Sequence, residues 1–378
     1  MHDMGLQDMR IFSNSLSRIE RGYIYMQILV MGGTGAMGVP VVRYCSETAD
    51  VFVTSRNPHD DLERVHYLVG NAHSDEFLRD SVFNRHYDVI IDFMSYSTAE
   101  FTNRVDMLLD ATDHYIFLSS GRVYADKQEP LTEEDPRILD VCKDEEYLAT
   151  DEYALFKARC EDILRQRPEK GWTIVRPYIT FNSQRLQLGV YEKENWLRRF
   201  IDGHTIIVPE DILHKKTTIT FGDDVALRIA KLSMAKETIG QTYNVSNSKS
   251  INWEEVLRIY DDCLAEITGH RMKLKYVPDS TGLQKVWNKY QIIYDRLYTR
   301  QFDNRKQEAF CGDSYTDLKK GIMSCLGECM KNPIYAEHKI SGRYEGWADK
   351  LSGEYSPLKS IPGKKNKLKY LQRRLLST

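Results

Sequence analysis

The sequence predicts an α/β fold in which a mostly parallel sheet is covered by helices on both faces. The candidate strands are apolar without strict alternation, which is typical of strands buried on both sides. Helix-like segments at 38–45, 99–112 and 153–167 separate several of them, and this β-α-β rhythm is typical of a doubly wound sheet. The predicted strands are 27–31, 51–54, 67–69, 88–93, 114–118 and 172–175.

Composition narrows the class of protein. The chain has 378 residues, of which 42% are hydrophobic and 28% charged, which is ordinary for a soluble globular protein. The net charge of -3 supplies no bulk positive field, so we expect neither a nucleic acid nor a membrane as partner. No run approaches the ~18 apolar residues of a membrane-spanning helix.

The cysteines predict neither a metal site nor a disulfide framework. There are seven, an odd number, and only Cys325 and Cys329 lie close together in sequence. That spacing lacks the second cysteine or histidine pair of a zinc site. We therefore expect a reduced, cytoplasmic protein without a metal.

The pattern divides the chain into segments. Residues 1–25 are polar and aperiodic, and we expect them to be a disordered extension. Residues 26–182 carry the regular alternation and a glycine motif at Gly32, Gly35 and Gly38, and they form the predicted dinucleotide-binding domain. Residues 183–355 are a smaller mixed α/β, mainly substrate-binding portion, although 217–247 continue the core fold. Residues 356–378 form a basic tail, expected to be a solvated terminal helix or a loose end, with a basic arm for a phosphate or acidic partner as the alternative.

The second portion combines charged helical segments with short strands. The predicted helices are 192–202, 223–235 and 253–268. The predicted strands between them are 205–208, 242–245 and 273–277.

A glycine motif follows the first strand directly and opens a helix. Its spacing is G-x-x-G-x-x-G at Gly32, Gly35 and Gly38. The first glycine permits a tight turn, the second allows the backbone to approach a pyrophosphate, and the third packs helix on strand. The helix N-terminus then presents N–H groups to the phosphates. The other loop residues expected beside a dinucleotide are Thr34, Ala36 and Met37.

A tyrosine and a lysine lie four residues apart on the predicted helix 153–167. Positions i and i+4 share one helix face, so the ammonium group of Lys157 can lie beside the hydroxyl group of Tyr153. A neighbouring cation favours the phenolate form, which suits tyrosine for general acid or base catalysis.

A serine pair adds weight to this arrangement. Ser119-Ser120-Gly121-Arg122-Val123-Tyr124 follows the fifth predicted strand at its carboxyl end, where ligands bind in doubly wound sheets. Ser120, Tyr153 and Lys157 together make a plausible proton-handling triad at a hydride-transfer site.

With these motifs the chain resembles the extended short-chain dehydrogenase/reductase family of NAD(P)-dependent epimerases, dehydratases and reductases that modify nucleotide sugars. The resemblance spans roughly 27–330 and rests on the glycine motif, the serine segment and the Tyr153–Lys157 pair, in the family's order. It implies a Rossmann-type domain, Tyr153 as acid or base, Lys157 also holding the nicotinamide ribose, and Ser120 on the reacting oxygen. It also implies a homodimer.

Departures from the family pattern narrow the predicted reaction. Dehydratases of this family place Asp and Glu after the hydroxyl residue, where this chain has Gly121 and Arg122. The fucose-forming epimerase-reductases place a cysteine there. Neither pattern fits, which leaves a keto-sugar reductase, most plausibly at C4, or a nucleotide-sugar 4-epimerase.

The end of the second predicted strand favours NADP over NAD. Thr54-Ser55-Arg56-Asn57 lacks the acidic residue that usually meets the ribose of NAD, and the Arg56 guanidinium and Ser55 hydroxyl suit a 2′-phosphate. NADP in turn favours a net reductase, and NAD remains the alternative. The other residues expected to contact the cofactor are Asn71, Phe93, Met94, Ser95 and Tyr178.

Substrate recognition is predicted from charge. Family substrates carry a diphosphate, and we expect Ser120, Asn182, Arg185 and Arg199 to contact the substrate, with Trp196 available to stack on a base. A hypothesis of another class is a non-enzymatic protein on this fold that binds RNA or senses cofactor. The presence of Ser120, Tyr153 and Lys157 favours the enzyme.

Overall fold

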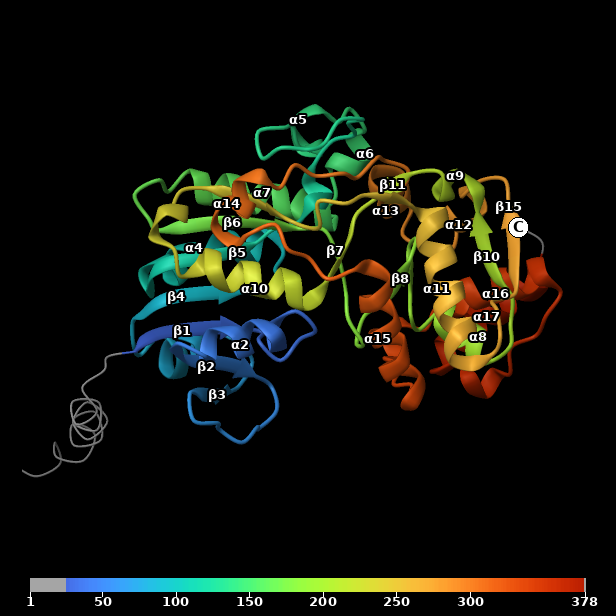
Figure 1. Cartoon of the computed structure of the whole chain (residues 1–378), viewed down its shortest axis with the longest axis horizontal. Helices are drawn as coiled ribbons and strands as arrows, with labels where there is room; N and C mark the ends of the chain where they lie inside the picture. The colour runs from blue at the N-terminus through green and yellow to red at the C-terminus, as the bar shows by residue number, and fades with distance from the viewer. Residues whose placement is uncertain (1–24, 377–378) are drawn as a thin grey trace, which may run out of the picture.

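The computed structural model describes residues 25–376, which form two lobes (Figure 1). The predicted disordered extension, apart from Tyr25, lies outside the described residues. One lobe holds the large sheet, and the other is built mainly from helices of the second half of the chain (Figure 1).

A seven-stranded parallel sheet forms the first lobe, with the order β13-β6-β5-β4-β1-β2-β3. This confirms the predicted fold class and every predicted strand of the first domain to within a few residues. Because β1 lies between β2 and β4, the winding direction reverses at its carboxyl end, where ligands bind in such sheets. The strands are Met26–Met31 (β1), Ala49–Ser55 (β2), Val65–Val69 (β3), Tyr87–Asp92 (β4), Thr112–Leu118 (β5), Trp172–Pro177 (β6) and Thr242–Val245 (β13).

Helices cover both faces of this sheet (Figure 1). Helices α2 and α10 contact each other on one face, and α4 and α7 contact each other on the opposite face. Alternate residues of β1 follow this division, since Ile28 and Val30 pack in one hydrophobic cluster while Leu29 and Met31 pack in the other. The helices are Gly38–Ser46 (α2), Thr98–Asp110 (α4), Tyr153–Arg165 (α7) and Gly222–Ser233 (α10).

The chain returns from the second lobe to complete the sheet. β12 (Ile219–Phe221) pairs with β7 (Ile179–Phe181), α10 follows, and β13 then adds to the edge of the sheet beside β6. The seventh strand therefore comes from the segment predicted to continue the core fold.

The second lobe packs helices around the short parallel pair β10 (Ile206–Pro209) and β15 (Leu274–Val277). The prediction for 253–268 is confirmed by α11 (Trp253–Thr268). The prediction for 192–202 is too long, because Tyr191–Glu192 pairs as β9 and the helix begins at Trp196. The other longer helices of this half of the chain are Trp196–Ile201 (α8), Arg305–Cys311 (α14), Leu318–Lys331 (α15), Gly342–Ser352 (α16) and Lys364–Leu375 (α17).

The basic segment 356–378 is helical over most of its described length. Helix α17 packs along α16, with Tyr370 fully buried, so this segment is a docked helix rather than a loose end. The remaining short helical turns include Asp75–Phe77 (α3), Ile138–Val141 (α5), Glu145–Leu148 (α6), Glu210–Leu213 (α9), Thr281–Gln284 (α12) and Lys289–Gln291 (α13). The remaining short strands are Gln187–Leu188 (β8), Lys216–Thr217 (β11) and Ile251–Asn252 (β14).

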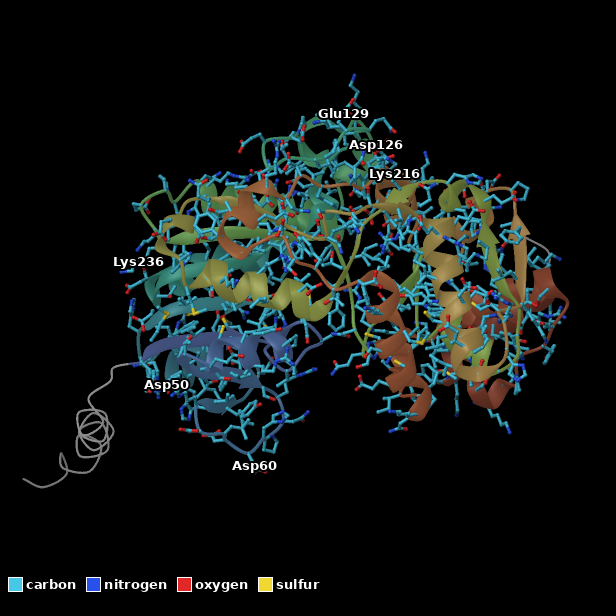
Figure 2. All side chains as sticks on the ribbon, viewed as in Figure 1. Asp50, Asp60, Asp126, Glu129, Lys216 and Lys236 are labelled. Atoms are coloured by element: carbon cyan, nitrogen blue, oxygen red, sulfur yellow. The ribbon has the colours of Figure 1, made fainter. Side chains whose placement is uncertain are left out.

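Charged side chains such as Asp60, Glu129 and Lys236 project outward from the surface of both lobes and their connections (Figure 2). Within residues 25–376, no helix has the length and apolar character needed to cross a membrane.

Candidate active site

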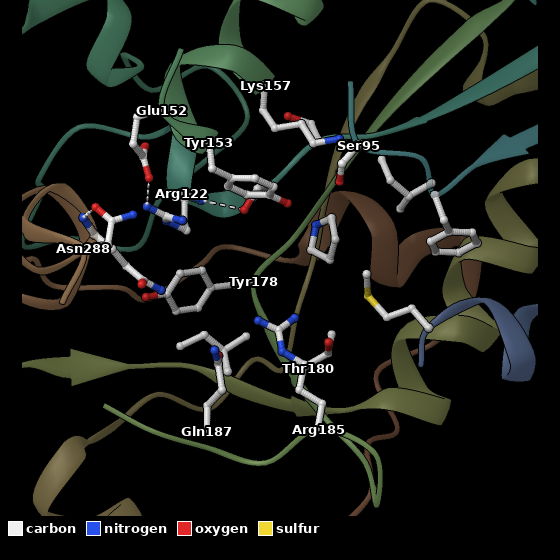
Figure 3. A pocket seen from close by; sticks show the side chains of 18 of the residues that line it. Ser95, Arg122, Glu152, Tyr153, Lys157, Tyr178, Thr180, Arg185, Gln187 and Asn288 are labelled. Carbon is white, nitrogen blue, oxygen red and sulfur yellow. Dashed lines mark hydrogen bonds and ion pairs between the residues drawn. The ribbon is translucent and has the colours of Figure 1, made fainter. Parts of the chain in front are cut away.

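A cavity of about 540 Å³ lies at the carboxyl ends of the central strands, between the two lobes (Figure 3). Its walls come from the β1–α2 loop at Met37, the segments after β4 and β5, the start of α7 and the β6–β7 connection. The second lobe contributes Arg185, Gln187, Asn288 and Arg296. The cavity is thus placed where the strand order of a doubly wound sheet positions a ligand.

The glycine loop has the local geometry that its spacing predicts. Gly32 has a φ of +70°, a conformation that side chains other than glycine rarely adopt, and its N–H donates to Thr54 Oγ1 at 2.9 Å. A Cβ atom on Gly38 would lie 2.6 Å from Gly33 Cα, so the start of α2 can approach the loop after β1 this closely only with glycine there. Met37, directly before Gly38, reaches the cavity.

Tyr153 and Lys157 both line the cavity from the first turn of α7 (Figure 3). Glu152 caps this helix, its side chain accepting from the Ala154 N–H at 2.8 Å. The Tyr153 side chain is 39% exposed, whereas Lys157 is 3% exposed, with its Nζ 4.7 Å from the centre of the Phe117 ring. Neither side chain makes a hydrogen bond with any residue that the structure describes, so both polar groups are available to a ligand.

The two serines after β5 differ in availability, although both line the cavity. Ser119 Oγ donates to Glu161 Oε1 at 2.6 Å, so its proton is already committed. Ser120 Oγ instead accepts from the Arg122 N–H at 3.2 Å, which leaves its own proton free to donate. This difference favours Ser120, as the sequence predicts, as the group that binds a substrate oxygen.

Arg122 is a prominent member of the site that the sequence did not assign to binding or catalysis. Its Nη2 pairs with Glu152 Oε1 at 2.6 Å, and its guanidinium carbon lies 5.2 Å from the centre of the Tyr153 ring (Figure 3). Its Nε lies 3.5 Å from Asp295 Oδ2, in the second lobe. Because Arg122 follows the serine pair by two residues, its place in the cavity could have been foreseen from the motif, but its partners are remote in sequence.

The buried side chain of Asp295 contacts several polar groups of the site. It accepts from the Tyr178 hydroxyl at 2.9 Å and from Arg300 Nε at 3.1 Å, and it also contacts Arg296 Nη1. Burial alone would raise the pKa of Asp295, but Arg296, Arg122 and Arg300 outweigh this and lower it, so the group is a carboxylate. The ring of Tyr178 lines the cavity while its hydroxyl group is turned to Asp295.

Only some of the residues predicted to hold a dinucleotide line the cavity. Phe93 and Ser95, after β4, line the cavity together with Met37. The backbone N–H of Met94 donates to Asp92 Oδ1 at 2.8 Å. Outside the cavity lining are Ser55, buried at the end of β2, and the exposed Arg56 and Asn71, with Thr34 and Gly35 exposed on the glycine loop. Of these predicted residues, only Met37, Phe93 and Ser95 therefore line the cavity together with Tyr153, Lys157 and Tyr178.

Of the predicted substrate residues, Arg185 lines the cavity, whereas Asn182 contacts the glycine loop beside it. Arg185 is partly exposed and lies 3.2 Å from Glu192. Asn182 Nδ2 donates to the Ala36 carbonyl group at 2.7 Å, so this side chain fastens the glycine loop to the second lobe.

The prediction that Arg199 contacts the substrate is wrong. Its side chain is completely buried in the second lobe, where Nη1 donates to Glu345 at 2.7 Å and to Asp349 at 2.9 Å. A guanidinium paired in this way has no donors left for a diphosphate. Trp196 is likewise fully buried, its Nε1 donating to the Leu186 carbonyl group at 3.1 Å, and cannot stack on a base.

One group of three possible metal ligands occurs among the described residues, at His204, Asp349 and Glu354. Arg199 pairs with both carboxylates, at 2.9 Å to Asp349 and 3.3 Å to Glu354. The cation that these acids neutralise is therefore a side chain of the protein itself.

The comparisons with known proteins agree on architecture. No protein-family model matches the chain, and no curated protein matches it in sequence. Among solved structures, MoeE5 in complex with UDP-glucuronic acid and NAD superposes with a TM-score of 0.62 at 15% identity, over 81% of this chain and 99% of that one. The chain has the fold of this protein.

Two further structures support the same assignment. A UDP-glucuronic acid 4-epimerase mutant from Bacillus cereus, with a fluorinated substrate analogue and NAD, gives a TM-score of 0.59 at 13% identity over 82% of this chain and all of the other. A short-chain dehydrogenase/reductase superfamily protein from Agrobacterium tumefaciens with bound NAD gives 0.58 at 16% identity over 81% and 98%. The fold predicted from the resemblance is confirmed.

Proposed function

We propose that this protein is an NAD(P)-dependent oxidoreductase of the extended short-chain dehydrogenase/reductase type that acts on a nucleotide-activated sugar. The observation that carries the proposal is that Ser120, Tyr153 and Lys157, which come from two separate segments, line one cavity with Met37 of the glycine loop. A cavity in which a proton-handling group lies beside a predicted dinucleotide-binding loop is suited to oxidising or reducing a carbon–oxygen bond.

In this reaction the protein's residues handle the proton and hold the oxygen. Tyr153 donates its proton to the oxygen as a carbonyl becomes an alcohol, or accepts it in the reverse direction. Lys157, nearly buried and without a hydrogen bond or ion pair to any described residue, stabilises the phenolate electrostatically. Ser120 Oγ–H donates to the same oxygen and fixes its position. NAD(P), when bound, supplies or accepts the hydride.

The cofactor would be held by the glycine loop and the residues beside it. Gly32, Gly35 and Gly38 provide the phosphate turn, Phe93 and Ser95 line the inner part, and Lys157 reaches the nicotinamide ribose. Arg56 is exposed at the end of β2 and is free to meet a 2′-phosphate, which supports NADP over NAD. The three matched structures described above have NAD bound, so NAD stays the alternative.

The charge of the cavity supports a diphosphate substrate. Its described lining includes four cations, Arg122, Lys157, Arg185 and Arg296, and a single carboxylate, Glu152. Arg122 and Arg296 are paired with Glu152 and Asp295, so the charges left to attract and orient an anionic ligand are Lys157 and the partly exposed Arg185 beside Glu192. UDP-glucuronic acid and UDP-glucose are bound by MoeE5, which shares this fold. A nucleotide sugar is therefore the substrate class that we propose, with reaction at C4.

A net keto-sugar reductase and a 4-epimerase use the same residues but differ in their treatment of the cofactor. A reductase consumes NADPH stoichiometrically, whereas an epimerase restores its own tightly held NAD. The proposal also includes a homodimer that forms through helices such as α7, which light scattering would test. It further includes a cytoplasmic location.

The experiment is a screen of the full-length protein against a panel of nucleotide sugars and their 4-keto derivatives, with NADPH and with NAD. Loss of NADPH absorbance with one 4-keto sugar supports the reductase. Interconversion of two epimers without net cofactor change supports the epimerase. If the protein binds neither cofactor and turns over no member of the panel, the oxidoreductase proposal is wrong and a binding role on this fold takes its place.

A further inference from the structure

Helix α17 turns its polar side inward. Tyr370, fully buried, donates its hydroxyl proton to Asp349 Oδ2 at 2.9 Å and accepts from the Ser356 N–H at 3.0 Å. The Asn366 side chain accepts from the Gly342 N–H and donates to the Ile340 carbonyl group, each at 2.7 Å. A Cβ atom on Gly342 would lie 2.1 Å from the Asn366 carbonyl oxygen, so the two helices are closely packed. The helix is thus fixed in orientation.

The outward side of α17 is the apolar one. Leu368, Leu375 and Leu376 are exposed by 56%, 63% and 61% of their surface, and Leu371 is partly exposed. With 3.6 residues per turn, positions 368, 371 and 375 form one stripe along the helix. An amphipathic helix docked on a protein normally buries such a stripe. Here the stripe faces away from the protein, and no described residue covers it.

Lysines flank this stripe on both sides. The helical angles place Lys365 and Lys369 on one side and Lys367 on the other, with Lys364 at the start of the helix. None of these four lysines makes an ion pair or hydrogen bond with any described residue. After Glu354 the chain has seven basic residues and no acidic one. The segment after Glu354 is therefore strongly positive, although the net charge of the whole chain is -3.

We propose that this outward face of α17, the leucine stripe with its flanking lysines, binds the surface of a bilayer that contains anionic lipids. Exposed leucines between lysines are the pattern of an interfacial helix, because the leucines enter the acyl boundary while the lysine stems extend to the headgroups. Each lysine near such a surface contributes about 1 kcal/mol, equivalent to about fivefold in partitioning. The sequence-based expectation of no membrane partner rested on the net charge and on the lack of a membrane-spanning run, and neither observation detects an interfacial helix.

Charge and shape favour a bilayer over the two other occupants that such a face could have. A second copy of this chain bound through the same face would oppose one positive segment to another, with no acidic residue after Glu354 to pair with. A nucleic acid would match the lysines but would leave the central leucines without a partner. An anionic bilayer satisfies both. Helix α17 lies at the end of the second lobe away from the Rossmann sheet, so binding there leaves the cavity open (Figure 1).

The test is co-sedimentation of the full-length protein with vesicles of phosphatidylcholine alone and of phosphatidylcholine mixed with phosphatidylserine. We expect binding to the mixed vesicles only, weakening as salt is raised. Replacing the leucines (Leu368→Gln, Leu375→Gln, Leu376→Gln) should weaken binding by about tenfold or more. Replacing the lysines (Lys364→Gln, Lys365→Gln, Lys367→Gln, Lys369→Gln) should weaken it by about fivefold for each charge removed.

Matched controls lie on other surfaces. Leu62 is 64% exposed on the first lobe, and Lys216 and Lys236 are exposed away from α17, so Leu62→Gln and Lys216→Gln/Lys236→Gln should bind like the wild type. All variants should keep the wild-type unfolding temperature, since every substituted side chain is at least partly exposed. Failure of the wild type to bind mixed vesicles, equal binding to neutral vesicles, or equal loss in the controls would each overturn the proposal. So would binding of single-stranded RNA that needs the lysines but not the leucines.

Discussion

The guanidinium carbon of Arg122 lies 5.2 Å from the centre of the Tyr153 ring, while its Nη2 pairs with Glu152, the residue that caps the Tyr153 helix. Its Nε lies 3.5 Å from Asp295 in the second lobe. Arg122 therefore connects the proposed acid–base tyrosine with both lobes of the protein. A cation over one face of the ring favours a single orientation of the phenol.

We predict that Arg122 is a positioning residue for Tyr153. In Arg122→Met the ring loses this contact, and a displacement of about 1 Å at a reacting group can cost about 100-fold in rate. We therefore expect kcat to fall by about 10- to 100-fold while the KM for substrate changes less. Arg122→Lys should recover only part of kcat, because lysine lacks the planar fork that reaches both carboxylates. Steady-state kinetics of both variants, with thermal unfolding to verify folding, would check this, and an unchanged kcat in Arg122→Met would contradict it.

Substitutions at Gly35 and Gly38 are expected to have different effects, one on cofactor binding and the other on the stability of the fold. A Cβ atom on Gly38 would lie 2.6 Å from backbone of Gly33, so Gly38→Ala should destabilise the fold by about 1–3 kcal/mol. A Cβ atom on Gly35 would meet nothing nearer than the Gly32 carbonyl oxygen at 3.5 Å, so Gly35→Ala should leave stability unchanged but weaken dinucleotide binding. Denaturant unfolding and cofactor titration on both variants would show this. Equal effects of the two substitutions on stability would argue against these roles.

Substitution of Arg56 tests whether the protein prefers NADP or NAD. If its guanidinium group binds the 2′-phosphate, Arg56→Ala should weaken NADPH binding by about tenfold or more and leave NADH binding nearly unchanged. The side chain is exposed, so the fold should not be affected. Titrations of both cofactors by fluorescence would measure the ratio. If both affinities fall together, Arg56 lies on the adenine without discriminating, and NAD becomes the better assignment.

Acid stability should depend on the buried pair of Glu161 and Arg176. Burial alone would raise the pKa of Glu161, but Arg176, donating at 2.8 and 2.6 Å, outweighs it and lowers the pKa to about 2. A lowered folded-state pKa stabilises the protein above the unfolded value near ~4.3, and this stabilisation is lost as the pH falls toward 2. The free energy of unfolding should thus decline by on the order of 3 kcal/mol across this window from this group alone.

A matched variant isolates that contribution. Glu161→Gln leaves the buried Arg176 without its charge partner and should cost about 3–5 kcal/mol at neutral pH. Its free energy of unfolding should then fall less steeply than that of the wild type between pH 4.3 and 2. Urea unfolding at several pH values would compare the two slopes, and identical slopes would show that Glu161 is not the group responsible.

Much of the fold could be predicted because its signals are local. The strand 27–31, the glycine spacing and the helix that begins at Tyr153 are each encoded within a few residues, and the structure contains all three. Helix 253–268 also matches, since its apolar periodicity runs without interruption from Trp253. By contrast, Glu192 belongs to a strand, because its pairing with Gln187 overrides the helical pattern of 192–202.

The composition of the site was harder to predict because it depends on pairing between distant residues. Arg199 and Arg185 look alike in sequence, yet only Arg185 reaches the cavity, and Arg199 is neutralised by Glu345 and Asp349, about 150 positions later in the chain. Likewise, Arg122 gains its position through Asp295. Counting charged residues along a sequence cannot distinguish an arginine that is available to bind a ligand from one that is already paired with carboxylates of the protein.

The most direct test of the proposed activity is turnover by Tyr153→Phe compared with the wild type on the nucleotide sugar that the screen identifies, with cofactor affinity measured in parallel. The substitution removes one hydroxyl group from a side chain that is 39% exposed and has no hydrogen bond to any described residue, so folding should be preserved. We expect kcat to fall by at least about 100-fold while cofactor binding remains. Retained turnover in Tyr153→Phe would contradict the assignment of Tyr153 as the proton donor and with it the proposed mechanism.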